Sequence, residues 1–240
     1  TDRKQWAKAN PSYPHRTPAE SILRLQRKLA ADSFLREGLG LWDETIGVPD
    51  PPVMSVERWA ALTVESAPSD GAVAYGVKFS PAGDLIALAA AVKPETGPVH
   101  VEGIKVAPTA DGTRWLVTWL AARSAPVAID GRAGAGALAV DLRKAGVPVR
   151  RVHRVTVDEA IAAATGMVNA VAAGDVTHLD DPALAVDDVI RRPIGKTGGW
   201  GFGGRGDADV SLHEAASLAR WAVAQRKTAR PGSRRVAVPG

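Results

Sequence analysis

Residues 71–106 contain three consecutive strand patterns joined by short turns, and this limits the fold more than any other feature of the sequence. In the first strand, alternate positions are aromatic or β-branched: Val73, Tyr75, Val77 and Phe79. Turn residues follow at 80–84, and further strands are predicted at 85–92 and 99–106. Because strands linked by short turns pair antiparallel, this segment predicts a three-stranded meander.

The pattern then alternates between helix and strand. The expected elements, in chain order, are helix 112–123, strand 126–130, helix 134–145, strand 147–152, helix 156–173, helix 182–192 and helix 211–225. Capping boxes at 156–159 and 211–214 open two of these helices, and a glycine-rich stretch at 195–206 precedes the last one. Together these patterns predict an α/β fold with a mixed sheet, in which parallel strands extend the antiparallel meander and helices flank it.

The two ends of the chain are predicted to differ from this domain, which we assign to residues 67–227. Residues 1–66 form a connector, in which Pro18 begins a helix that ends near Gly38 before a proline-rich linker. Residues 228–240 form a basic tail without acidic residues. Such a tail is predicted to be disordered, although its charge also suits contact with nucleic-acid phosphates.

Composition excludes several classes of protein. The 45% hydrophobic and 23% charged fractions are ordinary for a globular domain. Without cysteine there is no disulfide or thiolate metal site, and the five histidines show no metal-ligand spacing. No run approaches the roughly 18 apolar residues of a membrane span, and the N-terminus lacks the apolar core of an export signal. We therefore expect no membrane association.

Asp130 is the strongest candidate for a functional side chain. It ends the predicted buried strand at 126–130, and Gly131 follows it directly. Ligands of α/β sheets bind at the carboxyl ends of strands, and a carboxylate buried there is costly unless it meets a metal ion or a donor. A turn or helix-capping aspartate explains the same position, so the local pattern leaves both interpretations open.

Three further acidic residues have a structural and a functional interpretation. Asp207 and Asp209 lie just before the last predicted helix, where the helix dipole favours an acid. Since Ser211 is the predicted cap of that helix, Asp209 is available for another role. Asp84 lies in the first turn, where aspartates commonly serve the turn itself.

One glycine pattern is compatible with nucleotide binding. Residues 134–139 follow a strand and open a helix, as in a dinucleotide-binding turn. That fingerprint needs an acidic residue at the end of the next strand, where this sequence has Arg150, Arg151, Val152 and His153. Close packing of a helix on the sheet explains the small residues better, and the chain has no G-x-x-x-x-G-K-[ST] phosphate loop.

Landmarks along nearly the whole chain resemble the large terminase of tailed bacteriophages, in its C-terminal nuclease domain and in the connector that precedes it. The landmarks are residues 6–11, 34–37 and 39–42 in the connector, 76–81 in the first strand, 127–131 in the fourth strand, 177–178 with 182–184, and 209–219 around the final helix. Their order and spacing are more specific than any single landmark.

The resemblance implies an RNase H-like fold and a metal-dependent endonuclease that cuts concatemeric double-stranded DNA by two-metal phosphodiester hydrolysis. By position, Asp130 and Asp209 are the expected metal ligands, with Asp207 assisting them. The expected ions are Mg²⁺ or Mn²⁺, which prefer oxygen ligands. The expected DNA contacts are basic residues near these acids in the sequence: Arg132, Lys196 and Arg205.

Position 78 departs from the family pattern. The resemblance implies an aspartate there, but the sequence has Lys78, whose ammonium cannot ligate a metal. Three interpretations follow. Asp84 completes the metal site across the hairpin, or Lys78 replaces one metal electrostatically and leaves a one-metal nuclease. In the third, the change inactivates cleavage and leaves a domain that holds DNA.

The resemblance also implies partners and a location. The expected partners are double-stranded DNA, the portal protein, the small terminase subunit and an ATPase domain of the same full-length chain. The expected location is the cytoplasm of the infected bacterial host. Two alternative functions remain at this point: a catalytically weakened domain that binds DNA and couples to the packaging motor, and a nucleotide-binding α/β enzyme.

Overall fold

The computed structural model describes residue 6 and residues 12–28, 50–194 and 198–225. The chain divides into two compact units, Thr1–Asp50 and Pro51–Gly240. In the first unit, helix α2 (Ala19–Lys28) buries Ile22 in a small cluster with Trp6, whose ring packs edge-on against Tyr13. The helix predicted from Pro18 to Gly38 is thus present over its first part, and its remainder lies outside the described residues.

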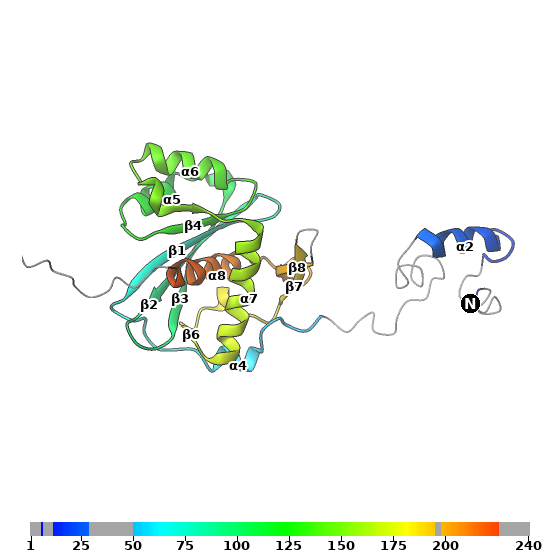
Figure 1. Ribbon diagram of the computed structural model, residues 1–240, viewed down its shortest axis with the longest axis horizontal. Helices are drawn as coiled ribbons and strands as arrows, with labels where there is room; N and C mark the ends of the chain where they lie inside the picture. Colours follow the sequence, from blue (N-terminus) through cyan, green and yellow to red (C-terminus); the bar gives the residue numbers. More distant parts are fainter. Residues whose placement is uncertain (1–5, 7–11, 29–49, 195–197, 226–240) are drawn as a thin grey trace, which may run out of the picture. The chain divides into compact units, whose positions relative to one another are not determined.

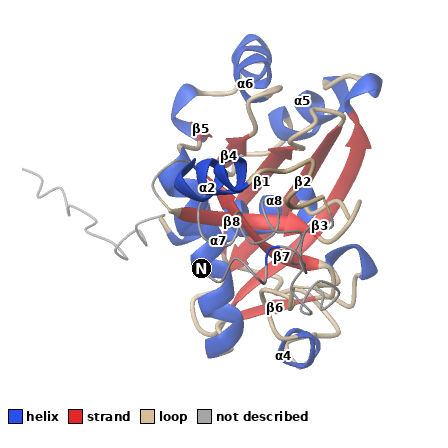
Figure 2. Ribbon diagram, turned by 90° about the vertical axis from the view of Figure 1, so that its right-hand side faces the viewer, coloured by secondary structure: helices blue, strands red, loops and turns tan. Residues whose placement is uncertain are grey.

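The second unit contains a six-stranded mixed sheet and a separate β-hairpin (Figures 1 and 2). The strands are β1 (Ala72–Phe79), β2 (Leu85–Lys93), β3 (Val99–Pro108), β4 (Val127–Asp130), β5 (Val152–Arg154), β6 (Val176–His178), β7 (Val189–Ile194) and β8 (Gly199–Gly204). The helices are α4 (Val56–Ala60), α5 (Arg114–Ala121), α6 (Ala135–Lys144), α7 (Val157–Ala173) and α8 (Ser211–Ala224).

The strand order of the sheet is β5-β4-β1-β2-β3-β6. Strands β1, β2 and β3 form the predicted antiparallel meander. Strand β4 pairs parallel with β1, β5 pairs parallel with β4, and β6 pairs parallel with β3 at the opposite edge. The predicted fold class, a meander extended by parallel strands and flanked by helices, is confirmed.

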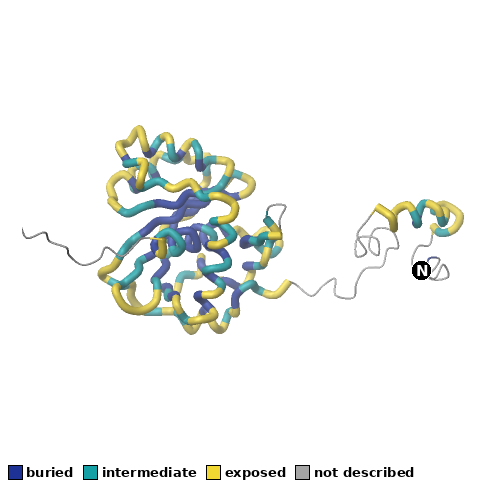
Figure 3. Tube along the Cα trace, viewed as in Figure 1, coloured by how far each residue is buried: buried dark blue, intermediate teal, exposed yellow. Residues whose placement is uncertain are grey.

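Large apolar side chains on one face of the sheet pack against α5 and α6. In β1 the alternation predicted from sequence directs Tyr75, Val77 and Phe79 to this face, where Ile129 of β4 and Leu138 of α6 join them. These side chains exclude water from the layer between sheet and helices, and Figure 3 shows the central strands as the most buried part of the unit. Figure 1 shows α5 and α6 on this side of the sheet.

The opposite face of the sheet is made of small residues and lies under α7 and α8. The small residues that pack on this side are Ala74, Ala87, Ala89, Ala91 and Ala128. Gly76 shows how closely α8 approaches, because a Cβ atom at this position would lie 1.9 Å from the carbonyl oxygen of Ala215. The sequence therefore encodes a thick apolar layer on one face and a close helix contact on the other.

Residues 51–66, which the sequence analysis assigned to the connector, belong to the second unit. Met54 and Trp59 are buried in the core that contains α7 and α8. The Trp59 ring stacks on His178 at a centroid distance of 3.8 Å, and the backbone of Thr63 forms a bridge with that of His178. These contacts attach α4 to the edge of the sheet that β6 forms.

Several local predictions were wrong. The segment predicted as helix 182–192 is a short 3-10 turn (Pro182–Leu184) followed by β7, and β8 occupies much of the glycine-rich stretch. Helix α8 begins as predicted, but Val210 is its N-cap and no side chain caps it. By contrast, the capping box formed by Thr156 and Glu159 at the start of α7 is confirmed.

Within the described parts of the chain, no helix is both long enough and apolar enough to span a bilayer.

The contact between Gly76 and α8 predicts that the effect of a glycine-to-alanine change on stability depends strongly on its position. Gly76→Ala forces α8 away from the sheet and is expected to lower the free energy of unfolding by about 3 kcal/mol, the upper range for overpacking. Gly136→Ala is the matched control, because its Cβ meets only Arg154 Nη2 at 4.0 Å and alanine favours the helix. Urea denaturation of both variants measures the difference. Equal stabilities would contradict the packing argument.

Candidate functional site

Lys78 and Asp130 are neighbours at the carboxyl ends of two parallel strands. In the register of β1 and β4, Lys78 lies directly opposite Asp130. Because alternate residues of a strand face opposite ways, both side chains leave the sheet on the small-residue face, where α8 lies. The RNase H-like fold that the resemblance implies places the first and fourth strands side by side and parallel, and the structure confirms this pairing.

Helix α8 brings Glu214 to the same place. Glu214 lies in the first turn of α8 and directly precedes Ala215, the residue whose carbonyl oxygen approaches Gly76. The short distance between helix and sheet therefore positions the Glu214 side chain over the end of β1. Lys78 Nζ lies 3.1 Å from Glu214 Oε1 and 2.5 Å from Asp130 Oδ2, so one ammonium bridges two carboxylates.

This cluster, formed by Lys78, Asp130 and Glu214, is largely buried. The side chains of Lys78 and Glu214 are 10% and 13% exposed, whereas that of Asp130 is 23% exposed. Burial opposes the charge on Lys78, but Glu214 and Asp130 outweigh it and hold the pKa of the ammonium above its ordinary value. Burial raises the pKa of the Glu214 carboxyl, against the opposing effects of Lys78 and Arg192. Lys78 is therefore the charged centre of the cluster.

The cluster lies in the wall of a cavity of about 370 Å³. The cavity is bordered by the ends of β1 and β4, by α7 and α8, and by the β7–β8 hairpin, which contributes Arg192 and Phe202. Arg132, in the loop after β4, also lines it and is exposed. Three basic and two acidic side chains thus line the cavity, so basic groups outnumber acidic groups by one.

One oxygen of the cluster has no hydrogen-bond partner among the described residues. Glu214 Oε2 is buried and makes no hydrogen bond, although Oε1 of the same carboxyl contacts Lys78. A buried carboxylate oxygen without a donor is costly, so this atom marks a place where a ligand would be stabilising.

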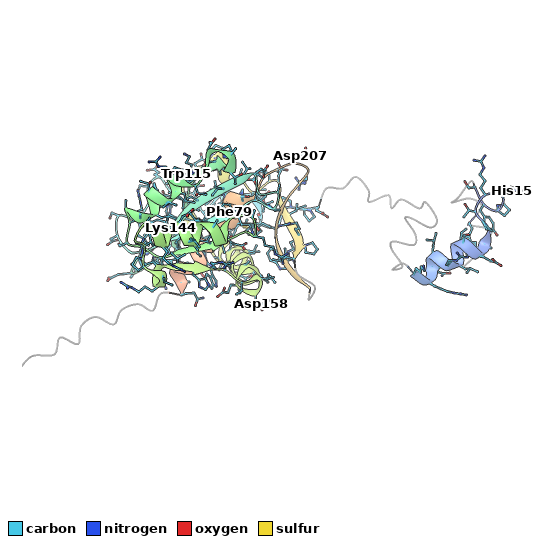
Figure 4. All side chains as sticks on the ribbon, turned by 90° about the horizontal axis from the view of Figure 1, so that it is seen from above. His15, Phe79, Trp115, Lys144, Asp158 and Asp207 are labelled. Atoms are coloured by element: carbon cyan, nitrogen blue, oxygen red, sulfur yellow. The ribbon has the colours of Figure 1, made fainter. Side chains whose placement is uncertain are left out.

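The remaining predicted acids lie elsewhere. Asp84 Oδ1 accepts a hydrogen bond from Ser80 Oγ at 2.6 Å within the β1–β2 turn, and this contact lowers the pKa of Asp84. Asp209 Oδ1 accepts a hydrogen bond from Ser211 Oγ at 2.8 Å. Asp207 is exposed, and Figure 4 shows it at the periphery of the unit. None of these three residues lines the cavity, and their predicted roles as ligand or assistant stay predictions.

Of the three basic residues predicted to contact DNA, Arg132 lines the cavity and Arg205 does not. Arg205 Nη1 forms an ion pair of 2.9 Å with Asp188 Oδ1 and donates to the carbonyl oxygen of Asp187, which holds the loop before α8 to the start of β7. Lys196 lies outside the described residues.

Two residues of the site were missed from the sequence. Glu214 was assigned to a capping box and Arg192 to a helix, whereas Glu214 contacts Lys78 and Arg192 lies on β7 at the cavity. Helical spacing could have indicated Glu214, since Ser217 and Leu218, three and four residues later, line the same cavity. No sequence signal identified Arg192, because the glycine-rich sequence of β8 was interpreted as a loop and the β7–β8 hairpin was not predicted.

The glycines after β4 serve packing. A Cβ atom at Gly134 would lie 2.2 Å from Phe79 Cε1, so a larger residue would displace the ring that fills the core. Packing against Phe79 therefore explains the small residues at the start of α6, and a nucleotide-binding role is not needed to explain them.

Asp130 and Glu214 are the side chains of this cluster that could hold a divalent ion. Among the described residues, no group of three or more histidine, aspartate or glutamate side chains gathers that could hold a metal. Asp130 and Glu214 remain as a carboxylate pair, and the unpartnered Glu214 Oε2 is a free ligand atom. One or two carboxylates completed by water suffice for Mg²⁺. A second ion in the same cluster would have to lie beside the Lys78 ammonium.

Comparison with solved structures gives the relatives of this fold. The chain aligns with the crystal structure of the HK97 bacteriophage large terminase at a TM-score of 0.62 and 16% identity, covering 92% of this chain and 54% of that one. It aligns with the large terminase nuclease from thermophilic phage G20c at a TM-score of 0.53 and 17% identity, covering 74% of this chain and 100% of that one. The chain thus spans about half the length of the HK97 protein.

A further structure of the G20c nuclease contains bound magnesium and aligns at a TM-score of 0.52 and 14% identity, covering 73% of this chain and 97% of that one. No family model matches the chain, and no curated protein matches it. The fold is therefore that of the phage large-terminase nuclease, a mixed α/β sheet of the RNase H-like kind. The likeness that the sequence landmarks predicted is confirmed at the level of fold.

His213, next to Glu214 in α8, is expected to make the stability of the fold depend on pH. Its Nε2 lies 2.9 Å from the carbonyl oxygen of Ala185, and its Nδ1 is buried without a partner. Burial lowers the pKa of His213, against the raising effects of the Ala185 and Leu184 carbonyls and of nearby carboxylates.

Because the unfolded chain takes up a proton that folded His213 resists, stability is expected to fall as the pH drops below about 6.5, the ordinary histidine pKa. The amide of glutamine in His213→Gln can still donate to Ala185. This variant should reduce the slope of the free energy of unfolding against pH by up to about 1.4 kcal/mol per pH unit below that pH. Part of the slope persists, since burial also lowers the pKa of His100. Chemical denaturation across a pH series measures it, with the exposed His15→Gln as control. An unchanged slope would exclude His213 as its source.

Proposed function

We propose that this chain is the nuclease domain of a phage large terminase, which hydrolyses phosphodiester bonds of double-stranded DNA during genome packaging. The observation that carries the proposal is the cavity at the end of β1 and β4, where Asp130 and Glu214 flank Lys78 on the terminase nuclease fold. The HK97 likeness supports an ATPase domain in the same full-length chain. We also propose the portal protein and the small terminase subunit as partners, and the cytoplasm of the infected bacterial host as the location.

The charges of the cavity support a division of roles. Arg132 and Arg192 would attract the DNA backbone, and contacts to phosphate position a duplex without reading its sequence. Asp130 and Glu214 would hold a divalent ion, Mg²⁺ or Mn²⁺. The chemistry that such an ion supplies is activation of water and neutralisation of the charge that develops on phosphate. Lys78 keeps the two carboxylates together and reduces their mutual repulsion.

Cleavage tests the proposal directly. Purified protein with Mn²⁺ is expected to nick supercoiled plasmid, and Asp130→Ala and Glu214→Ala should each reduce the rate by at least about 100-fold, the scale lost when a preorganised charged group leaves an active site. Asp141→Asn, at a half-exposed carboxylate on α6, is the control and should cut at the wild-type rate. Duplex binding without any nicking would instead support a domain that holds DNA. A protein that neither binds nor nicks DNA would refute the proposal.

DNA binding gives a second test. Arg132→Ala should weaken duplex binding equally for all sequences and reduce the slope of log Kd against log salt by about 1, the effect of one lost phosphate contact. Arg123→Ala is the matched control, since Arg123 lies over the Trp119 ring on the helix layer at the other face of the sheet. Titrations by fluorescence anisotropy at several salt concentrations measure both. A loss confined to particular sequences would contradict the role of Arg132.

A further inference from the structure

We propose that the Lys78 ammonium is a resident cation of the site, which occupies one cation position permanently and limits the site to a single divalent ion. The inference rests on the proposed function, because it assigns the positions where charge on DNA phosphate is neutralised. Its evidence, however, is the geometry of the cluster alone.

The position of Lys78 is that of a bridging cation. Its Nζ lies between carboxylate oxygens of two different elements, Asp130 at the end of β4 and Glu214 in α8. Both oxygens are within hydrogen-bond distance, so the ammonium makes the contacts that a bound ion would make to the same two side chains. The cluster thereby brings together a strand and a helix that are distant in the sequence.

The ammonium cannot leave this position without cost. Its side chain is 10% exposed, and leaving would place two carboxylates near each other without a counter-charge in a buried setting. A second divalent ion at the same place would meet the ammonium at contact distance and be repelled by it. The Lys78 ammonium therefore already supplies the positive charge that balances the two carboxylates at this cation position.

We place the one remaining divalent ion beside the carboxylate oxygens that do not contact Lys78. Glu214 Oε2, the oxygen that does not contact Lys78, is buried without a partner, and the partly exposed Asp130 lines the same cavity. The site therefore has two cation positions. The Lys78 ammonium fills one, and Asp130 and Glu214 provide ligand atoms for a divalent ion at the other.

Direct metal binding tests the inference without DNA. Isothermal titration with Mn²⁺ is expected to give at most one ion per wild-type chain at this site. Lys78→Ala should bind one additional Mn²⁺, or bind its ion at least about tenfold more tightly, because two carboxylates are released from the ammonium. Lys78→Ala should also melt at a lower temperature in EDTA and recover several degrees with Mn²⁺, as expected for a ligand that binds only the folded state.

Two controls separate this effect from a loss of charge in general. Lys93→Ala removes a lysine from β2 of the same sheet and should bind Mn²⁺ as the wild type does. Lys78→Ala/Glu214→Gln leaves a single carboxylate in the cluster, so it should fold without metal and lose the additional binding.

The outcomes are distinct. If folded Lys78→Ala binds Mn²⁺ with the wild-type stoichiometry and affinity, Lys78 does not occupy a cation position. If Lys78→Ala fails to fold even with Mn²⁺, an ion cannot replace the ammonium, and the inference is again overturned. Neither result depends on plasmid cleavage, so the nuclease function can fail while the resident cation is confirmed, and the reverse also holds.

Discussion

The close approach of α8 to the sheet determines where the charged residues of this protein meet. Alanines on β1, β2 and β4, together with Gly76, leave no side chain that would keep the helix at an ordinary distance. The first turn of α8 therefore lies over the end of β1, and Glu214 reaches Lys78. An apolar face of ordinary size would lift the helix and separate the two carboxylates from their shared ammonium. The small residues thus do more than fill space, because they set the geometry of the cluster.

Charge balance then explains why the cluster is stable where it is. A buried carboxylate is costly alone, and two close together are costlier, but the Lys78 ammonium contacts both. Arg132 and Arg192 add positive charge around the same cavity, so it can attract a polyanion although it contains two acids. The unpartnered oxygen of Glu214 leaves the balance incomplete on one side. A lysine at position 78 is therefore compatible with ion binding, provided that a single ion is bound.

The sequence alone identified the meander and Asp130 at the end of the strand that follows it, because alternation and turn residues are local signals. The parallel pairing of the first and fourth strands was implied by the family resemblance and not by periodicity. It failed where local patterns have two meanings. The serine and glutamate at 211 and 214 fit a capping box, yet Ser211 donates to Asp209 and Glu214 contacts Lys78. The glycines at 199–204 fit a loop, yet they form β8. Asp209 was predicted as a metal ligand from the resemblance, and Glu214 was assigned to the capping box. Nothing in the one-dimensional pattern shows that the Glu214 side chain reaches Lys78.

The sequence by itself determined the meander, the large and small faces of its strands, and the positions of Lys78 and Asp130 near the ends of two strands. Those properties depend on residues close in the chain or on strict alternation. Only the tertiary structure decided that Lys78 lies opposite Asp130, that Glu214 of the last helix joins the site, that the hairpin contributes Arg192, and that the ammonium bridges two carboxylates. These features depend on how far α8 lies from the sheet and how it is rotated about its axis, which packing across the whole domain fixes and no local segment encodes.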